Sequence, residues 1–330
     1  MEYSVAVRTL GTGGKSYQKM LDSLKTQTIR PSAIIVYIAD GYPLPKETVG
    51  LEQYVYVKKG MVAQRALEYN EVTTEYILFL DDDVYLPPHA VETLYKEMAR
   101  NHAQVISPCV FANHQTGVKD KIRGTLLGRE VCRLWGNRWG NKILRTAGFS
   151  YNNHPVKPVY ESQSNAGPCF FCRKADFLQI HFAEELWLDK AYYPFPEDQV
   201  MFYKMYRSGL KVLTSFDSGI IHMDASTTVK NAEEKTEKLI YSEYRNKLIF
   251  WHRFIFLPER NPLLKIWAVA AFSYAYGVQA IKYFIQYLLG SRRMPIAYRK
   301  GVADGLSFIR SSVYLSLIHI SEPTRHSLIS

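Results

Sequence analysis

Short apolar runs alternate with amphipathic segments over residues 1–80. Residues 33–38 and 76–80 are continuous apolar runs of strand length, whereas residues 17–24 carry apolar side chains at helical spacing. Strands that are apolar on both faces and alternate with helices are typical of a parallel sheet covered on both sides. The pattern therefore predicts an α/β fold of nucleotide-binding character, with a mostly parallel central sheet flanked by helices.

The same kind of pattern continues toward residue 231, interrupted by one irregular stretch. Residues 113–160 are polar and rich in Gly and Asn, and we interpret them as an irregular insertion lying over the sheet. We assign 1–231 to one domain. Its other expected elements are strands near 5–7, 54–57, 210–213 and 219–221, a helix near 62–69, a strand passing into a helix over 169–177, and a helix from Pro194 that stops at Gly209.

The net charge of +10 is concentrated in one part of the chain. Between Arg245 and Arg310, eleven basic residues stand against two acidic ones, a surplus of +9 that leaves +1 for the rest. Such asymmetry points to an anionic surface, either membrane headgroups or nucleic acid. Long apolar runs alternate with the basic residues, which favours the membrane. We therefore predict a basic helical, membrane-associating region over 232–312.

One segment of this region is long and uncharged. Residues 266–281 carry no charge and are flanked by Lys265 and Lys282. A bilayer-spanning helix needs about 20 apolar residues, so this run is short unless both lysines reach the headgroups. We interpret 263–289 as a helix in the plane of the membrane interface, with a true span as the alternative.

Both ends of the chain bear on its location. The amino-terminal segment lacks the charged region and apolar run of a signal peptide, and four cysteines do not make a disulfide framework. These observations predict a cytoplasmic protein that associates peripherally with the inner face of the cell membrane. Residues 313–330 match nothing before them and look like translated sequencing-adapter read-through, so we expect a non-native tail there.

Three consecutive aspartates, Asp81, Asp82 and Asp83, follow the apolar run at 76–80. In an open parallel sheet, ligands bind beyond the carboxyl ends of the strands. Adjacent carboxylates repel one another, so we expect folding to tolerate them only where a cation compensates. A divalent ion with oxygen ligands, Mg²⁺ or Mn²⁺, meets this requirement and would bridge a diphosphate. The alternative is a solvated acidic turn that caps the helix beginning near Pro88.

Glu197 and Asp198 follow a proline at the start of a predicted helix. The helix macrodipole favours acids there, so capping is one explanation. Neighbouring aromatic residues would also dry the site and raise a carboxyl pKa toward that of a general base. His222 follows an apolar pair. A histidine in such a position is more often a hydrogen-bonded core residue, and a metal site elsewhere would be needed to make it a ligand.

Two further motifs are rejected. The run Gly11-Thr-Gly-Gly-Lys-Ser suggests a P-loop, but Thr9 stands where the first glycine is required, and Ser16 stands where a dinucleotide motif requires its third. Cys169 and Cys172 have CxxC spacing, but a strand directs these two thiols to opposite faces, which argues against a zinc or redox site.

Together these segments resemble the family 2 glycosyltransferases with the GT-A fold, over about residues 3–225. The chain departs from the family at Arg8-Thr-Leu-Gly, where Pro-Thr-Tyr-Asn is usual, and at Ala66, where Asn is common. The resemblance rests on the order and spacing of five pieces: Leu24-Lys-Thr-Gln-Thr-Ile-Arg-Pro, similar to the SLxxQTxxP signature; Asp40-Gly41; Arg65, 16 residues before Asp81; Tyr76 to Pro87, similar to the metal motif; and Glu197-Asp-Gln with Tyr-Arg-Ser-Gly, similar to the ED…RxxG segment.

The resemblance implies a role for each of these residues. It implies a divalent metal, Mn²⁺ or Mg²⁺, held by Asp83 with Asp81 and His222. It also implies a nucleotide-diphosphate sugar held by Thr9, Asp40 and Arg65, with Asp81 near the ribose and Asp82 orienting the turn. Asp198, beside Glu197, would take the proton from an acceptor hydroxyl, and the transferred sugar would invert its configuration.

We therefore expect an inverting, metal-dependent glycosyltransferase that builds a cell-surface polysaccharide on a glycan or lipid-linked acceptor at an anionic membrane. One alternative is a sugar-nucleotide nucleotidyltransferase, which would also use carboxylates and a metal but would release pyrophosphate. The other is a non-enzymatic protein that binds nucleic acid through the basic region, with steep salt dependence.

Overall fold

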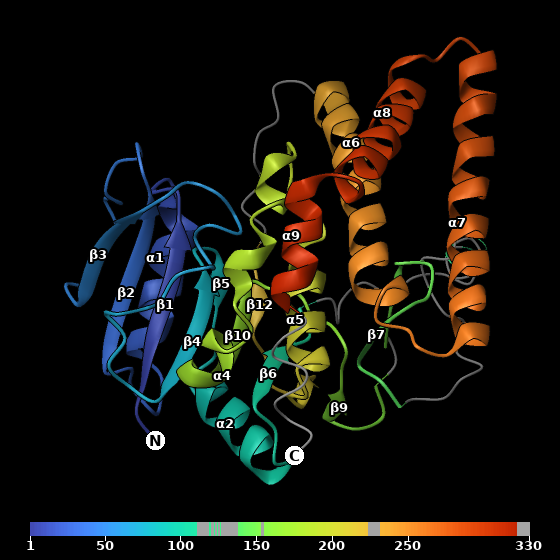
Figure 1. Ribbon diagram of the computed structural model, residues 1–330. Coiled ribbons are helices and arrows are strands. Elements are labelled where there is room, and N and C mark those ends of the chain that lie inside the picture. Colours follow the sequence, from blue (N-terminus) through green and yellow to red (C-terminus); the bar gives the residue numbers. More distant parts are fainter. Residues whose placement is uncertain are drawn as a thin grey trace.

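The computed structural model describes residues 1–110, 138–152, 155–223 and 232–321, together with four single positions between 111 and 137. A large sheet with its covering helices forms one half of the molecule, and long helices from the carboxyl-terminal part of the chain form the other (Figure 1). The fold is mixed α/β with a mostly parallel central sheet and a helical carboxyl-terminal region, as the hydrophobic pattern predicts.

The central sheet, as far as the described residues show it, has eight strands in the order β3-β2-β1-β4-β10-β6-β11-β9. Neighbours β3, β2, β1 and β4 are parallel, β6 and β11 are parallel, β10 runs antiparallel to β4 and β6, and β9 runs antiparallel to β11. The carboxyl ends of the parallel strands therefore share one edge. The strands are β1 (Tyr3–Thr9), β2 (Ala33–Ala39), β3 (Glu52–Val57), β4 (Tyr76–Asp81), β6 (Val105–Pro108), β9 (Val159–Glu161), β10 (Cys169–Arg173) and β11 (Val212–Ser215).

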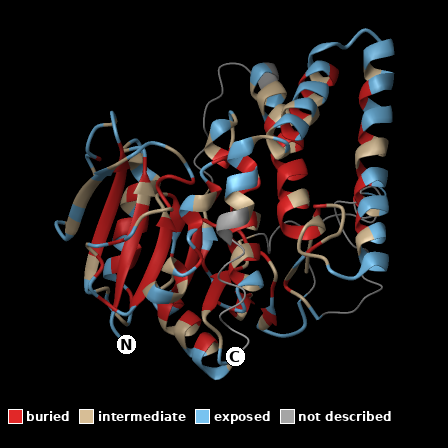
Figure 2. Ribbon diagram, in the orientation of Figure 1, coloured by how far each residue is buried: buried red, intermediate tan, exposed pale blue. Residues whose placement is uncertain are grey.

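Two apolar layers cover the sheet, because successive side chains of each strand point to opposite faces. Leu78 packs with α1 (Gly14–Lys25) and α2 (Ala90–Arg100), while Phe79 packs with α4 (Lys174–Leu178) and α5 (Glu197–Arg207). Figure 2 shows the sheet buried between them. Cys169 and Cys172 are buried in different layers, as expected of a strand that directs the two thiols to opposite faces.

Gln27 gives the segment resembling SLxxQTxxP a structural role. Its side-chain amide donates to the carbonyls of Leu86 (3.2 Å) and Pro87 (2.8 Å), and its side-chain oxygen accepts from the Val91 amide at 3.2 Å. Buried polar groups of this kind need such partners, and here the partners lie on the segment that follows the three aspartates. Gln27 therefore ties the end of α1 to the start of α2.

The helix predicted near 62–69 does not form. Residues 61–65 make a single turn, in which the Gln64 amide donates to the Gly60 carbonyl at 2.8 Å. The Asp189 carboxylate accepts from the amides of Val62 (3.1 Å) and Ala63 (2.8 Å), and Tyr69 has a positive φ of 50° that is incompatible with a continuing α-helix. A tertiary contact thus sets the shape of this loop, which carries Arg65.

Shorter elements complete the first 231 residues. β5 (Val84–Tyr85) pairs with β12 (Ile221–His222), and β7 (Asn141–Ile143) pairs with β8 (Phe149–Tyr151). Two 3₁₀ turns, η2 (Phe182–Glu185) and η3 (Leu188–Lys190), precede α5. Within the proposed insertion, residues 138–152 and 155–160 are described, and β9 at its end belongs to the central sheet. The rest of that interpretation falls mainly outside the described residues.

The carboxyl-terminal part is helical. α6 (Ala232–Phe250) runs into a π-helical turn, η4 (Trp251–Phe256), and is followed by α7 (Pro262–Leu288), α8 (Arg293–Ile309) and α9 (Ser312–Ser321). Within the described helices, none combines the length and hydropathy required to cross a bilayer. Tyr314, which falls in the expected non-native tail, is buried in α9, and its hydroxyl lies 2.7 Å from His252 Nδ1.

Close packing of α8 on α6 leads to the first prediction. A Cβ added at Gly301 would lie 2.5 Å from the Tyr241 carbonyl oxygen, whereas one added at Gly277 in α7 would meet no atom within 4 Å. We expect Gly301→Ala to lower the free energy of unfolding by about 1–3 kcal/mol through overpacking. We expect Gly277→Ala to raise it by about 0.5–1 kcal/mol through helix propensity. Urea unfolding followed by circular dichroism measures both, and equal effects of the two variants would contradict this packing.

Candidate active site

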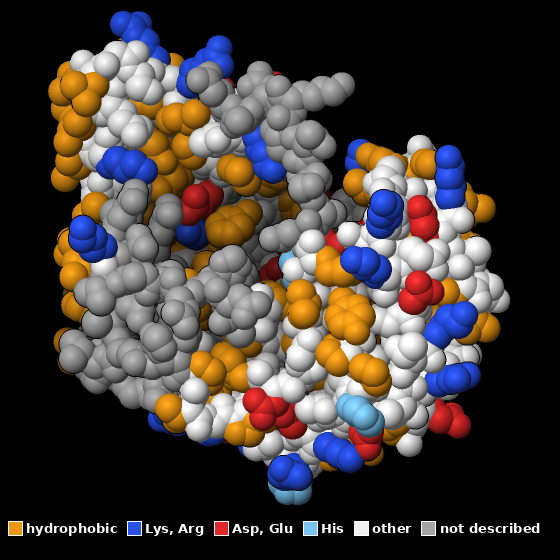
Figure 3. Space-filling model, turned by 180° about the vertical axis from the view of Figure 1, so that it is seen from behind, with side chains coloured by type: hydrophobic (Ala, Val, Ile, Leu, Met, Phe, Trp, Pro, Cys, Tyr) orange, Lys and Arg blue, Asp and Glu red, His pale blue; other side chains and the backbone are white. Residues whose placement is uncertain are grey.

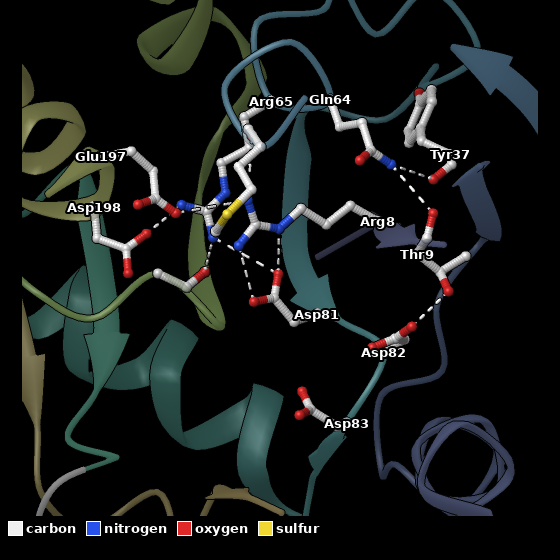
Figure 4. A network of polar contacts seen from close by, with 12 residues as sticks. Arg8, Thr9, Tyr37, Gln64, Arg65, Asp81, Asp82, Asp83, Glu197 and Asp198 are labelled. Carbon is white, nitrogen blue, oxygen red and sulfur yellow. Dashed lines mark hydrogen bonds and ion pairs between the residues drawn. The ribbon is translucent and has the colours of Figure 1, made fainter. Parts of the chain in front are cut away.

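The three consecutive aspartates point in different directions (Figure 4). Asp81 ends β4 and faces Arg8 and Arg65, the Asp82 carboxylate accepts from the Thr9 hydroxyl, and Asp83 faces His222. Over the described ranges, no group of three or more His, Cys, Asp or Glu side chains is arranged as a metal site. Each carboxylate of the turn therefore has a partner of its own, and the turn is not an exposed acidic cap.

Arg8 neutralises the first aspartate. Its Nε lies 2.5 Å from Asp81 Oδ1 and its Nη2 lies 2.9 Å from Oδ2, which is the bidentate geometry that suits a guanidinium and a carboxylate. Its Nη1 also donates to the Met61 carbonyl at 3.2 Å and lies 3.9 Å from Glu197 Oε1. The chain itself thus supplies a cation that compensates the charge of Asp81, and no metal ion is needed to neutralise this carboxylate.

Arg65 joins the aspartate turn to the start of α5. Its Nη1 pairs with Asp198 Oδ1, and its Nη2 lies 3.6 Å from Asp81 Oδ1. The same nitrogen donates to the Gly167 carbonyl at 2.6 Å. Only 3% of the Arg65 side chain is exposed, so these contacts compensate for its desolvation. Two arginines and three carboxylates (Arg8, Arg65, Asp81, Glu197 and Asp198) thus form one network.

Gly167 lies against this network and leaves no room for a side chain. A Cβ there would lie 1.9 Å from Asp198 Oδ1 and 2.4 Å from Arg65 Nη1. Side-chain atoms cannot approach so closely, so any other residue would displace the ion pair. The glycine is required here for space.

The carboxylates of the network are electrostatically distinct. Burial would raise the pKa of Asp81, but the charge and hydrogen bonds of Arg8 outweigh it and hold that pKa below the usual value. For Glu197, burial and then the neighbouring Asp198 charge prevail and raise the pKa to about 7. Burial likewise raises the pKa of Asp82 to about 6, against the hydrogen bond from Thr9.

Asp83 and His222 are held together by a two-residue ladder. β5 pairs with β12 so that His222 lies opposite Val84, and the Met223 amide donates to the Asp83 carbonyl at 2.8 Å. His222 Nε2 lies 3.0 Å from Asp83 Oδ1. A carboxylate oxygen and an imidazole nitrogen at this separation are suitable donors for Mn²⁺. These two side chains are therefore the candidate protein ligands of a divalent ion.

The start of α5 is fixed from the other half of the molecule. Asn246 of α6 is fully buried, and its side-chain amide donates to the carbonyls of Tyr193 (3.3 Å) and Phe195 (2.9 Å). The Ser242 hydroxyl accepts from the Tyr193 amide at 3.1 Å. Buried, partnered amides of this type hold a segment in one position. Helix α6 therefore determines where Glu197 and Asp198 lie.

Most of the residues singled out in the sequence come together at the carboxyl edge of the sheet. Arg65, Asp81, Glu197 and Asp198 share the network, with the Thr9–Asp82 and Asp83–His222 pairs on the same aspartate turn. Asp40 is exposed after β2, at the same edge but outside these contacts. The sequence did not identify Arg8, Gly167 or Asp189 as site residues, although a charged residue within the apolar strand at 3–9 was a usable signal for Arg8.

Comparison with protein families gives one match. Residues 54–156 match the model of Glycosyl transferase family 2. The matched segment includes Arg65 and the three aspartates, and it supports a glycosyltransferase as the class of enzyme. No curated protein matches the chain in sequence.

Among solved structures, the chain is similar to TarS from S. aureus with a TM-score of 0.48 and 15% identity, covering 82% of this chain and 43% of that one. It is also similar to TarS 1–349 in complex with UDP-GlcNAc, with a TM-score of 0.41 and 14% identity, and this match covers 92% of this chain and 91% of that one. The structure of GalNAc-T7 with UDP, GalNAc and Mn²⁺ has a TM-score of 0.48 and 13% identity, and the match covers 87% of this chain and 57% of that one. The chain thus spans less than half of the first of these TarS chains. Similarities at this level identify neither substrate nor mechanism.

Glu197 leads to a prediction about stability and pH. Its carboxyl group titrates near pH 7 in the folded chain and near 4.5 when unfolded, so folding weakens as pH rises between these values. Below pH 4.5 the Glu197 carboxyl group is protonated in both the folded and the unfolded chain, so its burial does not lower the free energy of unfolding through ionisation. We expect the free energy of unfolding of Glu197→Gln, relative to that of the wild type, to rise by about 2–3 kcal/mol as the pH is raised from 5 to 8.

Urea unfolding without added metal, at a series of pH values, measures this difference. Glu68→Gln, at an exposed glutamate, is the matched control and should show a difference that does not change with pH. A Glu197→Gln difference that is constant from pH 5 to pH 8 would contradict the assignment.

Proposed function

We propose that the chain is an inverting, metal-dependent glycosyltransferase. It would move a sugar from a nucleotide-diphosphate sugar to a hydroxyl group of a glycan or lipid-linked acceptor, in the synthesis of a cell-surface polysaccharide. One observation carries the proposal: Arg65 and the aspartate turn lie within residues 54–156, which match Glycosyl transferase family 2, and Arg65 joins that turn to Asp198. A proton acceptor and a binding site for an activated sugar would then be neighbours.

Asp198 is the better general base of the two acids at the start of α5. Its side chain is 23% exposed, against 8% for Glu197, so an acceptor hydroxyl can reach it. Arg65 fixes its carboxylate in position. The acceptor oxygen would attack the anomeric carbon and give its proton to Asp198, while the bond from that carbon to the diphosphate oxygen breaks. Attack on the face opposite the leaving group inverts the configuration. Glu197 would position Arg8.

The nucleotide end of the site is proposed around Asp83 and His222. These two residues would hold Mn²⁺ or Mg²⁺, and both oxygens of Asp81 are bonded to Arg8, which favours Asp83 over Asp81 as ligand. When bound, the metal supplies positive charge that stabilises the departing diphosphate. Thr9, Asp82 and Asp40 lie along the same edge and would contact the nucleoside. For Arg65, the buried contacts support a positioning role.

The activity itself is tested by incubating the full chain with a panel of nucleotide-diphosphate sugars and Mn²⁺, and measuring release of nucleoside diphosphate. A glycosyltransferase releases it from at least one donor, and faster when the correct acceptor is present. Release of pyrophosphate from a nucleoside triphosphate and sugar phosphate would instead identify a nucleotidyltransferase and overturn the proposal.

Asp198→Asn tests the base. The amide keeps the shape of the side chain but cannot accept the proton, so we expect transfer to fall by about 10²–10⁴-fold. Binding of the nucleoside diphosphate should change little, because Asp198 contacts the acceptor end of the site. Asp22→Asn, at an exposed aspartate of α1, is the control for loss of a carboxylate. Full transfer by Asp198→Asn would refute this role.

Asp83→Asn and His222→Ala test the metal ligands. Asp83→Asn removes the negative charge of one protein donor and His222→Ala removes the other donor, so we expect the Mn²⁺-dependent part of nucleoside diphosphate affinity to fall about 10–100-fold. Titration calorimetry with and without Mn²⁺ measures it. Asp82→Asn is the matched control for loss of a carboxylate from the turn: the Asp82 carboxylate accepts from Thr9, so any loss of nucleotide affinity should be the same with and without Mn²⁺. An equal loss in all three variants would contradict this ligand assignment.

A further inference from the structure

Helix α7 is bound to the rest of the chain along one narrow stripe. Its buried residues are Ala268, Phe272, Ala275, Gln279 and Tyr283, which follow one another at helical spacing. Phe272 stacks on Trp251 with ring centroids 4.2 Å apart, and Tyr283 stacks on Tyr298 at 4.9 Å. The Tyr276 hydroxyl donates to the Tyr244 carbonyl at 2.9 Å. These contacts fix the rotation of α7 about its axis and so determine which face points outward.

The outward face of α7 is apolar from end to end. At 100° per residue it lies opposite the buried stripe. Trp267 is 60% exposed, Phe284 62% and Leu288 68%. With a rise of about 1.5 Å per residue the face extends for roughly 40 Å. Other exposed large apolar side chains on it are Leu263, Ile266, Tyr274, Ile281 and Ile285. Figure 2 shows α7 exposed along its length, and hydrophobic side chains gather on that side of the molecule in Figure 3.

A continuous apolar face of this size on a protein surface marks an interaction site. The charges around the face indicate what kind of partner binds there. No Asp or Glu occurs between Pro262 and Ala303, whereas six Lys and Arg residues do. Lys265 Nζ lies 4.5 Å from the ring centroid of Phe256, and Lys282 Nζ lies 4.9 Å from that of Tyr283. Both lysines thus lie beside the buried stripe, toward the body of the protein, and leave the outward face uncharged.

The apolar face and the positive charge around it fit a lipid surface better than a second copy of the chain or a nucleic acid. A lipid surface offers hydrocarbon to the apolar face and anionic headgroups to the basic residues of this part of the chain. A second copy of the chain would bring two strongly basic regions together, and nucleic acid would have no cation to contact on the face. A span is disfavoured because one side of α7 is already packed on the protein and carries Gln279 and Lys282.

We propose that α7 lies in the plane of an anionic lipid bilayer, with its outward face (Leu263 to Leu288) in the boundary between headgroups and acyl chains. Trp267 and Phe284, near opposite ends, anchor it, and the exposed Arg292 and Arg293, just beyond its carboxyl end, contact lipid phosphates. This surface is independent of the proposed catalytic activity. A chain without glycosyltransferase activity would bind equally well.

Sedimentation of the full chain with phosphatidylglycerol–phosphatidylcholine vesicles tests the proposal. We expect binding that weakens as salt is raised, and about tenfold weaker partition for Trp267→Ser/Phe284→Ser. Both side chains are exposed, so the variant should fold, and circular dichroism and thermal unfolding verify this. Leu51→Ser/Tyr56→Ser is the matched control. These side chains are similarly exposed, 63% and 52%, and lie at the edge strand β3 of the central sheet, away from α7.

The depth of α7 gives a second readout. Lipids brominated near the headgroup boundary should quench part of the tryptophan fluorescence of the wild type and not of Trp267→Phe. Unchanged sedimentation of the Trp267→Ser/Phe284→Ser variant, or a wild type that stays in the supernatant, would overturn the proposal. So would a dimer in the absence of lipid that this double substitution converts to a monomer, because α7 would then be an interface between copies.

Discussion

The pairing of two buried arginines with three carboxylates holds the candidate site together. Arg8 comes from β1 and Arg65 from a loop before β4, and their partners come from the end of β4 and the start of α5. Elements far apart in the sequence therefore meet through charge. A buried charge without its partner is costly, so loss of either arginine would leave carboxylates uncompensated. Arg8 holds the pKa of Asp81 below its usual value while burial and the Asp198 charge raise that of Glu197, so two acids of one network differ in protonation.

Much of the fold was predictable because its strands are buried on both faces. The apolar runs at 33–38 and 76–80 correspond to β2 and β4, and the acids after Pro196 begin α5 as the sequence indicates. Apolar periodicity is a local property, so it identifies such elements directly. The loop at 61–65 was predicted wrongly as a helix because its conformation depends on Asp189, more than a hundred residues away. No local pattern contains that contact.

The site was predictable in its components and less so in its arrangement. Resemblance to a family selected Asp81 and Asp198, which the structure joins through Arg65. It did not reveal that three successive aspartates diverge, since the direction of each side chain depends on partners from β1 and β12. The space requirement at Gly167 is likewise visible only once the chain is folded. The spacing of residues along the sequence can suggest candidate site residues, but it does not reveal which side chains contact one another in the folded chain.

The hydrogen bonds from α6 to the segment before α5 have a consequence for how a substrate would arrive. Asn246 and Ser242 connect the residues around Tyr193 to the helical half of the molecule, against which α7 is packed. A chain docked through α7 would therefore keep its catalytic edge at a constant height and tilt relative to the lipid. An acceptor anchored in that bilayer would reach Asp198 by lateral diffusion, so its search would be two-dimensional, while a nucleotide sugar would enter from bulk solution.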